Sequence, residues 1–131
     1  MEDRISNDQE KIRAFTDLVT WQEGHALVLS IYRETSRFSR DELFGLTSQM
    51  RRSAVSITSN IAEGFGRRSM KEKLQFYFVA RGSLIELYNQ LIIAKDVGYL
   101  ATNTFDQLEA MFNKVHKLLN GLITKTKEFV L

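Results

Sequence analysis

Apolar residues along this chain recur at intervals of three and four positions in four separate stretches. The clearest stretch contains Leu43, Leu46, Met50, Ala54, Ile57, Ile61 and Phe65. This spacing places the side chains on one face of an α-helix. Similar faces are expected from about residue 20 to 36, from 69 to 97 and from about 102 to 127. The pattern predicts an all-α fold, an up-down-up-down four-helix bundle, because the connections are short.

Capping sequences mark where three of these helices are expected to begin. Thr20, Ser39 and Ser69 each stand three residues before a glutamate. In such a capping box the two side chains satisfy backbone N–H groups that the first helical turn leaves free. Gly98 is the expected C-terminal cap of the third helix, and Gly45 is expected to bend or restart the second.

Two further glycines lie inside predicted helices, where glycine costs up to about 1 kcal/mol relative to alanine. Gly24 falls in the first helix and Gly82 in the third. We expect both positions to be places where another helix packs closely, with Ala62 as the neighbour of Gly82.

Composition limits the class of protein. The chain has 131 residues, 44% of them apolar and 26% charged, as in a single globular domain. Residues 1–15 read as a polar tail or lead-in and 16–131 as the bundle. The tail has no apolar run, so no signal peptide is expected, and no stretch approaches the length of a membrane span. The absence of cysteine excludes disulfides and fits a cytoplasmic protein.

Positive charge is concentrated in the middle of the chain. From residue 37 to 81 there are nine Lys or Arg against four acids, a net +5, whereas the whole chain carries +2. Such a local field favours an anionic partner such as nucleic acid, although it also fits a solvated surface. The candidate phosphate-binding residues are Arg51, Arg52, Arg67, Arg68, Lys71 and Lys73. The alternative is that they pair with nearby acids, as Glu63 would with Arg67.

The third predicted helix is apolar on nearly all sides. Between residues 74 and 80 only Gln75 is polar, and residues 91–94 repeat the pattern. A helix on the surface of a monomeric bundle needs only one apolar stripe. We therefore expect a second contact surface on this helix, used for assembly into a homo-oligomer, or else unusually complete burial within the bundle.

Polar residues beside the apolar faces can be read in two ways. A structural network would join the second and third helices, using Asn60, Glu63, Arg81, Ser83 and Glu86. Alternatively, Glu63 and Glu86 would form a catalytic acid/base pair in a shared cleft. No nucleophile motif or metal-ligand cluster stands out, and His25 and His116 are expected to be packing or surface residues. We therefore favour a non-enzymatic protein with no cofactor and no metal.

The central stretch also carries a family resemblance. The segments Phe44–Arg52, Ala54–Ile57, Asn60–Arg67 and Ala80–Leu87, with Trp21-Gln22 and Gly98-Tyr99-Leu100, resemble the 23S rRNA intervening-sequence proteins, also called S23 ribosomal proteins. The likeness covers roughly residues 15–125. It departs from the family pattern at Ser39 and Thr58, where the family usually has proline, so a proline kink in the second helix is not carried over.

The resemblance implies an all-α bundle that assembles as a ring-shaped homopentamer. It also implies similarity to the accessory variability determinant of diversity-generating retroelements, a basic pentamer that binds a reverse transcriptase and nucleic acid. Three functions thus remain open: a nucleic-acid-binding oligomer, a protein-binding scaffold for a polymerase such as a reverse transcriptase, and a hydrolase that uses the two glutamates.

Overall fold

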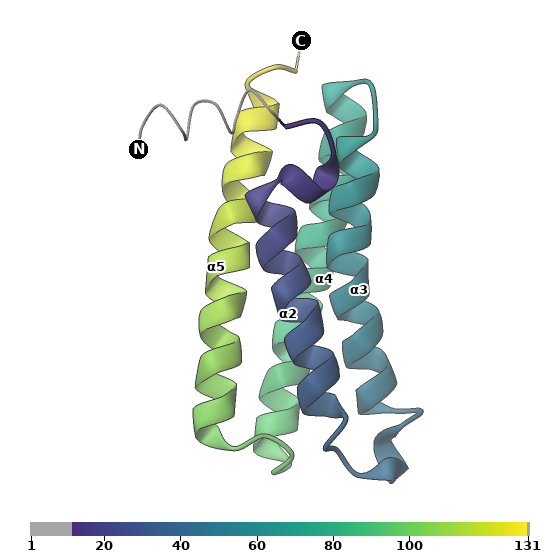
Figure 1. Cartoon of the computed structure of the whole chain (residues 1–131), viewed down its shortest axis with the longest axis vertical. Coiled ribbons are helices and arrows are strands. Elements are labelled where there is room, and N and C mark those ends of the chain that lie inside the picture. Colours follow the sequence, from purple (N-terminus) through teal and green to yellow (C-terminus); the bar gives the residue numbers. More distant parts are fainter. Residues whose placement is uncertain (1–11, 131) are drawn as a thin grey trace.

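The computed structural model describes residues 12–130 and contains four long helices (Figure 1). These helices are α2 (Val19–Thr35), α3 (Leu46–Phe65), α4 (Met70–Asp96) and α5 (Thr102–Lys127). Two short 3₁₀ helices, η1 (Phe15–Asp17) and η2 (Arg40–Glu42), precede α2 and α3. The prediction of an all-α fold with four helices is confirmed. The expected lead-in lies largely outside the described residues.

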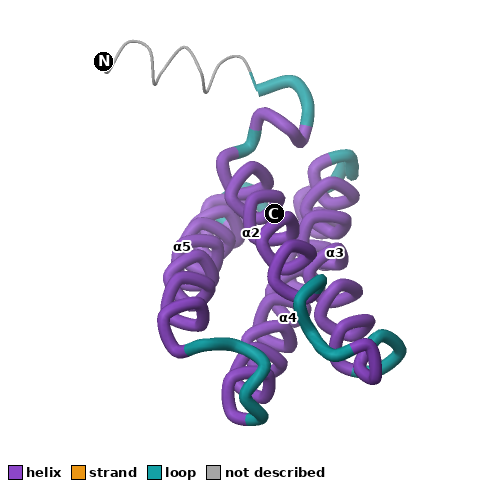
Figure 2. Tube along the Cα trace, turned by 60° about the horizontal axis from the view of Figure 1, so that its bottom comes forward, coloured by secondary structure: helices purple, strands orange, loops and turns teal. Residues whose placement is uncertain are grey.

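The helices run alternately up and down, and each packs against its neighbours in the sequence. α3 contacts α2 and α4, and α5 contacts α4 and α2, whereas within residues 12–130 α3 and α5 do not pack together. α3 and α5 are therefore diagonal partners across the bundle (Figure 2). The α2–α3 and α4–α5 connections share one end of the bundle, and the α3–α4 turn lies at the other end, with the C-terminus (Figure 1).

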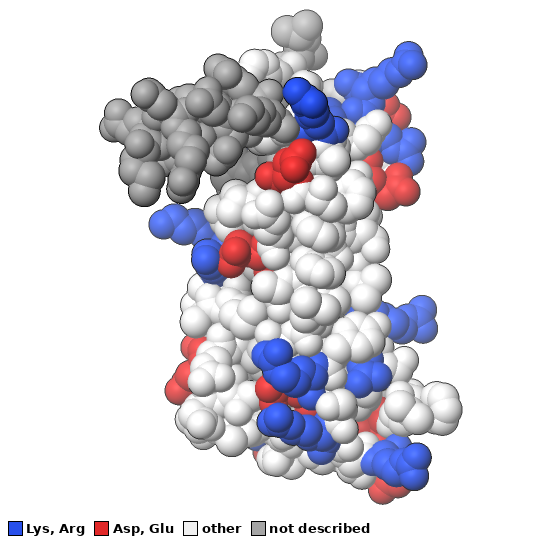
Figure 3. Space-filling model, viewed as in Figure 1, with Lys and Arg blue, Asp and Glu red and all other residues white. Residues whose placement is uncertain are grey.

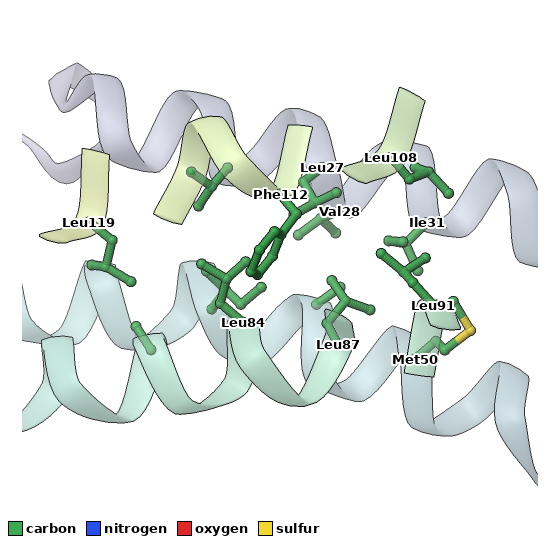
Figure 4. Packing of buried hydrophobic residues seen from close by; sticks show 14 of the residues in the cluster. Leu27, Val28, Ile31, Met50, Leu84, Leu87, Leu91, Leu108, Phe112 and Leu119 are labelled. Atoms are coloured by element: carbon green, nitrogen blue, oxygen red, sulfur yellow. The ribbon is translucent and has the colours of Figure 1, made fainter. Parts of the chain in front are cut away.

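One apolar face from each helix forms the core. Phe112 of α5 points toward Leu84 of α4, beside Leu27 and Val28 of α2 (Figure 4). α3 contributes Met50, which is 1% exposed, to the same cluster. The intervals of three and four residues therefore correspond to burial, as expected for helices that hide one stripe.

The helix ends agree with the sequence in most places. The Ser69 hydroxyl accepts a hydrogen bond from the Glu72 amide at 3.0 Å, and Gly98 has the positive φ of 90° that favours glycine. Gly45 directly precedes α3, so the expected restart is confirmed. The second capping box is wrong as the start of α3, because the Ser39 hydroxyl caps the short helix η2 instead. The first capping box is wrong: α2 begins at Val19, and the Thr20 hydroxyl donates instead to the Leu118 carbonyl of α5.

Close helix contacts occur at two glycines, and Gly82 is not one of them. A Cβ on Gly24 would lie 3.2 Å from the Thr58 methyl group, which confirms a close approach of α2 to α3. A Cβ on Gly64 would lie 2.6 Å from Cε1 of Tyr77, so α4 passes very close to α3 there. The prediction for Gly82 was wrong, because it is exposed and a Cβ would meet no atom of the described residues within 4 Å.

Candidate nucleic-acid interface

The six cationic side chains proposed to contact phosphate lie in two groups. Arg51 and Arg52 are in the second turn of α3, and the other four lie around the α3–α4 turn. From Arg52 to Phe65 at the end of α3 the rise is about 20 Å. On the face shown in Figure 3, Lys and Arg lie at both ends of the bundle and on the α5 side, whereas the middle of the face over α2 and α3 is mostly uncharged.

Two of these cations stabilise helix ends. Arg51 donates from Nε to the Thr35 hydroxyl at 2.9 Å and from a terminal nitrogen to the Tyr32 carbonyl at 3.4 Å. The Lys73 ammonium donates to the Phe65 carbonyl at 2.6 Å, and burial lowers the pKa of Lys73. Both side chains thus satisfy backbone carbonyls or side-chain oxygens in the last turns of α2 and α3, where cations suit the helix dipole.

Arg67 is held by two neighbours. Its guanidinium lies 3.2 Å from a Glu63 carboxylate oxygen and 4.6 Å from the centre of the Phe76 ring. The pairing of Glu63 with Arg67, the alternative to phosphate binding at this residue, is therefore present. Because the pair is exposed, it contributes little to the stability of the fold, and a phosphate could compete with Glu63 for the arginine.

Three cations remain free to meet a ligand. Arg52, Arg68 and Lys71 are exposed, and none forms an ion pair with another residue in the range 12–130. Arg68 and Lys71 stand together at the α3–α4 turn, whereas Arg52 lies on the outer side of α3. Exposed, unpaired cations of this kind are the side chains that displace counterions from a nucleic-acid backbone.

The polar residues between α3 and α4 form a hydrogen-bonded seam on the outside of the bundle. The Ser56 and Ser83 hydroxyls are 2.7 Å apart, and the Asn60 amide donates to the Ser56 carbonyl at 2.8 Å. One turn away, the Ser53 hydroxyl donates to a Glu86 carboxylate oxygen at 3.0 Å. The structure therefore joins Asn60 and Ser83 through Ser56, whereas Glu86 bonds to Ser53 separately, and no hydrogen bond within residues 12–130 links the two sets.

Arg81 and Glu63, the other two residues of the expected network, lie elsewhere. Arg81 donates to the Asn120 side chain of α5 at 3.1 Å, and Glu63 bonds to Arg67. Because Glu86 is level with Ser53, the two glutamates are separated by about 15 Å along α3. Only Glu86 lines the groove described below, so the structure does not bring the two carboxyl groups into one catalytic cleft.

An open groove runs across the outer side of α3 and encloses about 1140 Å³. Polar residues from α3 and α4 line it, together with Phe44, whose side chain is 93% exposed, and Gln90, which is 5% exposed. Sequence reasoning missed both residues. Phe44 lies in a connection, outside any helical period, and Gln90 could not be distinguished from a solvated glutamine without knowing which residues face it.

α4 leaves apolar side chains uncovered, as its composition predicted. The exposed ones are Val79, Ile85, Ile92 and Ile93, together with Val97 directly after the helix. The same helix buries Leu84, Leu87 and Leu91 in the core, so apolar side chains lie on both the core-facing and the outward-facing sides of α4. Within residues 12–130, no helix is long and apolar enough to cross a membrane, and no group of three or more His, Asp or Glu side chains could hold a metal ion together.

Comparison with known proteins identifies the family. The family model described as 23S rRNA-intervening sequence protein matches residues 16–121. Among solved structures, a crystal structure of a protein with unknown function from the S23 ribosomal protein family of Bacteroides thetaiotaomicron is similar, with a TM-score of 0.76 and 19% identity. The match covers 81% of this chain and 96% of that chain. No match is found among curated proteins. The chain belongs to the 23S rRNA-intervening sequence protein family.

Proposed function

We propose that this protein is a non-enzymatic homo-oligomer that binds RNA through the phosphate backbone, with little sequence preference. The observation that carries the proposal is that three of the six candidate cations, Arg52, Arg68 and Lys71, are exposed and form no ion pair within residues 12–130. Contacts to phosphate position a protein on nucleic acid but hold no base information. The lack of cysteine is consistent with action in the cytoplasm.

Assembly is the second part of the proposal. The uncovered apolar residues of α4 would be buried against further copies, and a cyclic ring, proposed to be a pentamer, is the closed way to use such a surface. Each copy would add its cations to a common array. Several weak phosphate contacts then act together, because one bound site raises the effective concentration at the next.

The proposal is tested by the salt dependence of RNA binding. Purified protein should bind a fluorescent single-stranded RNA, and the logarithm of the affinity should fall linearly with the logarithm of salt concentration. Arg68→Ala and Lys71→Ala should each reduce the slope by about 0.7 for every phosphate that the variant no longer neutralises. Lys117→Ala is the matched control, because Lys117 is also exposed but lies inside α5, away from the α3–α4 turn that carries Arg68 and Lys71. No RNA binding at low salt, or equal slopes for all three variants, would refute phosphate binding by these residues.

A protein-binding scaffold is the second candidate, favoured by the same uncovered apolar side chains of α4. In this alternative the assembled ring presents several copies of one patch to a protein such as a reverse transcriptase. It predicts little binding of RNA by the purified protein alone, so the salt titration separates the two candidates.

A further inference from the structure

The groove on the outer side of α3 contains an unsatisfied polar group. Oε1 of Gln90 is buried and has no hydrogen-bond partner within the part of the chain that the structure describes. A buried acceptor left unpaired costs about 1–3 kcal/mol. Because Gln90 lines the groove, a ligand that enters it can supply the missing donor after a small movement of the side chain.

Glu86 extends this row of acceptors. It lies one turn before Gln90 on α4 and lines the same groove. Only one of its carboxylate oxygens accepts the hydrogen bond from Ser53, so the other is available. The wall that α4 contributes is therefore built to receive N–H groups.

The α3 side of the groove presents a positive charge and an aromatic ring instead of hydrogen-bond acceptors. Arg52 is exposed there without an ion-pair partner in the described chain, and Phe44 presents an aromatic ring with almost all of its surface in solvent. The Ser53–Glu86 and Ser56–Ser83 bonds show that α3 and α4 run antiparallel in a fixed register, which places Gln90 level with Gln49. Phe44 lies two residues before the start of α3 and also lines the groove, so ring, cation and acceptors border the same groove.

We propose that this groove binds an unpaired nucleobase with an exocyclic amino group, together with its phosphate. The base stacks on Phe44, its amino group donates to Gln90 and Glu86, and the phosphate meets Arg52. A nucleotide supplies both the donor and the anion that the two walls require. An arginine from a protein partner would suit the acceptors but would be repelled by Arg51 and Arg52, which both line the groove. This inference rests on the proposed binding of RNA and adds base recognition to it.

The test compares three single-stranded pentanucleotides by fluorescence anisotropy. One carries adenine at every position, one carries purine bases that lack the 6-amino group, and one is abasic. With the unmodified protein, the adenine strand should bind about tenfold more tightly than the second strand, which has no amino donor, and about a hundredfold more tightly than the abasic strand, which can neither donate nor stack. Competition by adenosine monophosphate at similar concentrations would identify a free nucleotide as the source of the same chemistry.

Two variants locate the effect in the groove. Phe44→Ala should weaken binding of the adenine strand about tenfold because the base can no longer stack, and Gln90→Leu should remove the preference for the amino group while leaving binding of the abasic strand unchanged. Phe129→Ala is the matched control. Phe129 is also an exposed aromatic residue, 59% exposed, but it lies beyond the C-terminal end of α5, at the opposite end of the bundle.

The outcomes separate this inference from the proposed function. Equal, salt-dependent binding of the three strands would overturn base recognition and leave phosphate binding intact. A lower native mass for Phe44→Ala but not for Phe129→Ala, with strand preference unchanged, would also overturn it, because a second copy would then fill the groove. Failure of the unmodified protein to bind any strand at low salt would overturn both proposals.

Discussion

The close approach of α4 to Gly64 of α3 predicts the cost of one added methyl group. In Gly64→Ala the new Cβ would lie 2.6 Å from Cε1 and 2.9 Å from Cδ1 of Tyr77, and 3.1 Å from Cβ of Phe76. Tyr77 is buried, so its ring cannot simply turn into solvent. Overpacking of this kind costs about 1–3 kcal/mol. Alanine gains up to about 1 kcal/mol over glycine in a helix. Because a contact of 2.6 Å puts the overpacking cost toward the upper end of that range, about 2–3 kcal/mol, we expect a net loss of about 1–2 kcal/mol.

Chemical denaturation with urea measures this loss through the change in midpoint at constant m. The melting temperature should fall by roughly 4 °C for each kcal/mol. Adding Tyr77→Ala to Gly64→Ala should reveal a coupling of about 1 kcal/mol or more, because the ring that causes the clash is gone. A Gly64→Ala variant as stable as the parent, or an additive double variant, would refute the close approach of α3 and α4.

Three further predictions follow from other contacts. Gly82→Ala should stabilise the separate chain by about 0.5–1 kcal/mol in urea denaturation at concentrations too low for assembly, because a Cβ there meets nothing within the described chain; destabilisation at such concentrations would contradict the open surroundings of Gly82. Burial raises the pKa of Tyr77 to about 12 from its usual 10.0, so the folded state holds the proton longer and stability should fall by about 2–3 kcal/mol as the pH rises between those values. Tyr77→Phe should remove this part of the pH dependence, and an unchanged profile would contradict it. Lys73→Met should cost about 1–2 kcal/mol by removing the bond to the last turn of α3, whereas the exposed Arg68→Ala should change stability by no more than about 0.5 kcal/mol; equal losses would contradict the distinction.

The sequence predicted the features that depend on local spacing. Apolar residues at intervals of three and four, the Ser69 cap and Gly98 each act within one helix or at its end, so the number of helices and most boundaries followed from them. The capping prediction at Thr20 was wrong, because the Thr20 hydroxyl donates to the carbonyl of Leu118, which lies 98 positions away in the sequence. The prediction of close packing at Gly82 was wrong, because a glycine inside a helix indicates close packing only where another helix crosses at that residue.

The candidate site was harder to predict because it depends on tertiary contacts. In the sequence, Arg51 and Arg52 are equivalent, and so are Lys71 and Lys73. The structure ties Arg51 and Lys73 to neighbouring helix ends and leaves the other two exposed. Which cations can bind a ligand was therefore decided by the packing of α2, α3 and α4. Likewise, only the packing of α3 against α4 shows that Gln90 is buried and that its Oε1 has no hydrogen-bond partner within the described chain.

Self-assembly is the central claim, because it would bury the uncovered side of α4 and gather the free cations into one array. Sedimentation equilibrium of the unmodified protein at micromolar concentration measures it most directly. The account predicts a particle of several times the 15.2 kDa chain mass, about 76 kDa for the proposed pentamer, that is, five copies. A single species of 15.2 kDa across the micromolar range would contradict it.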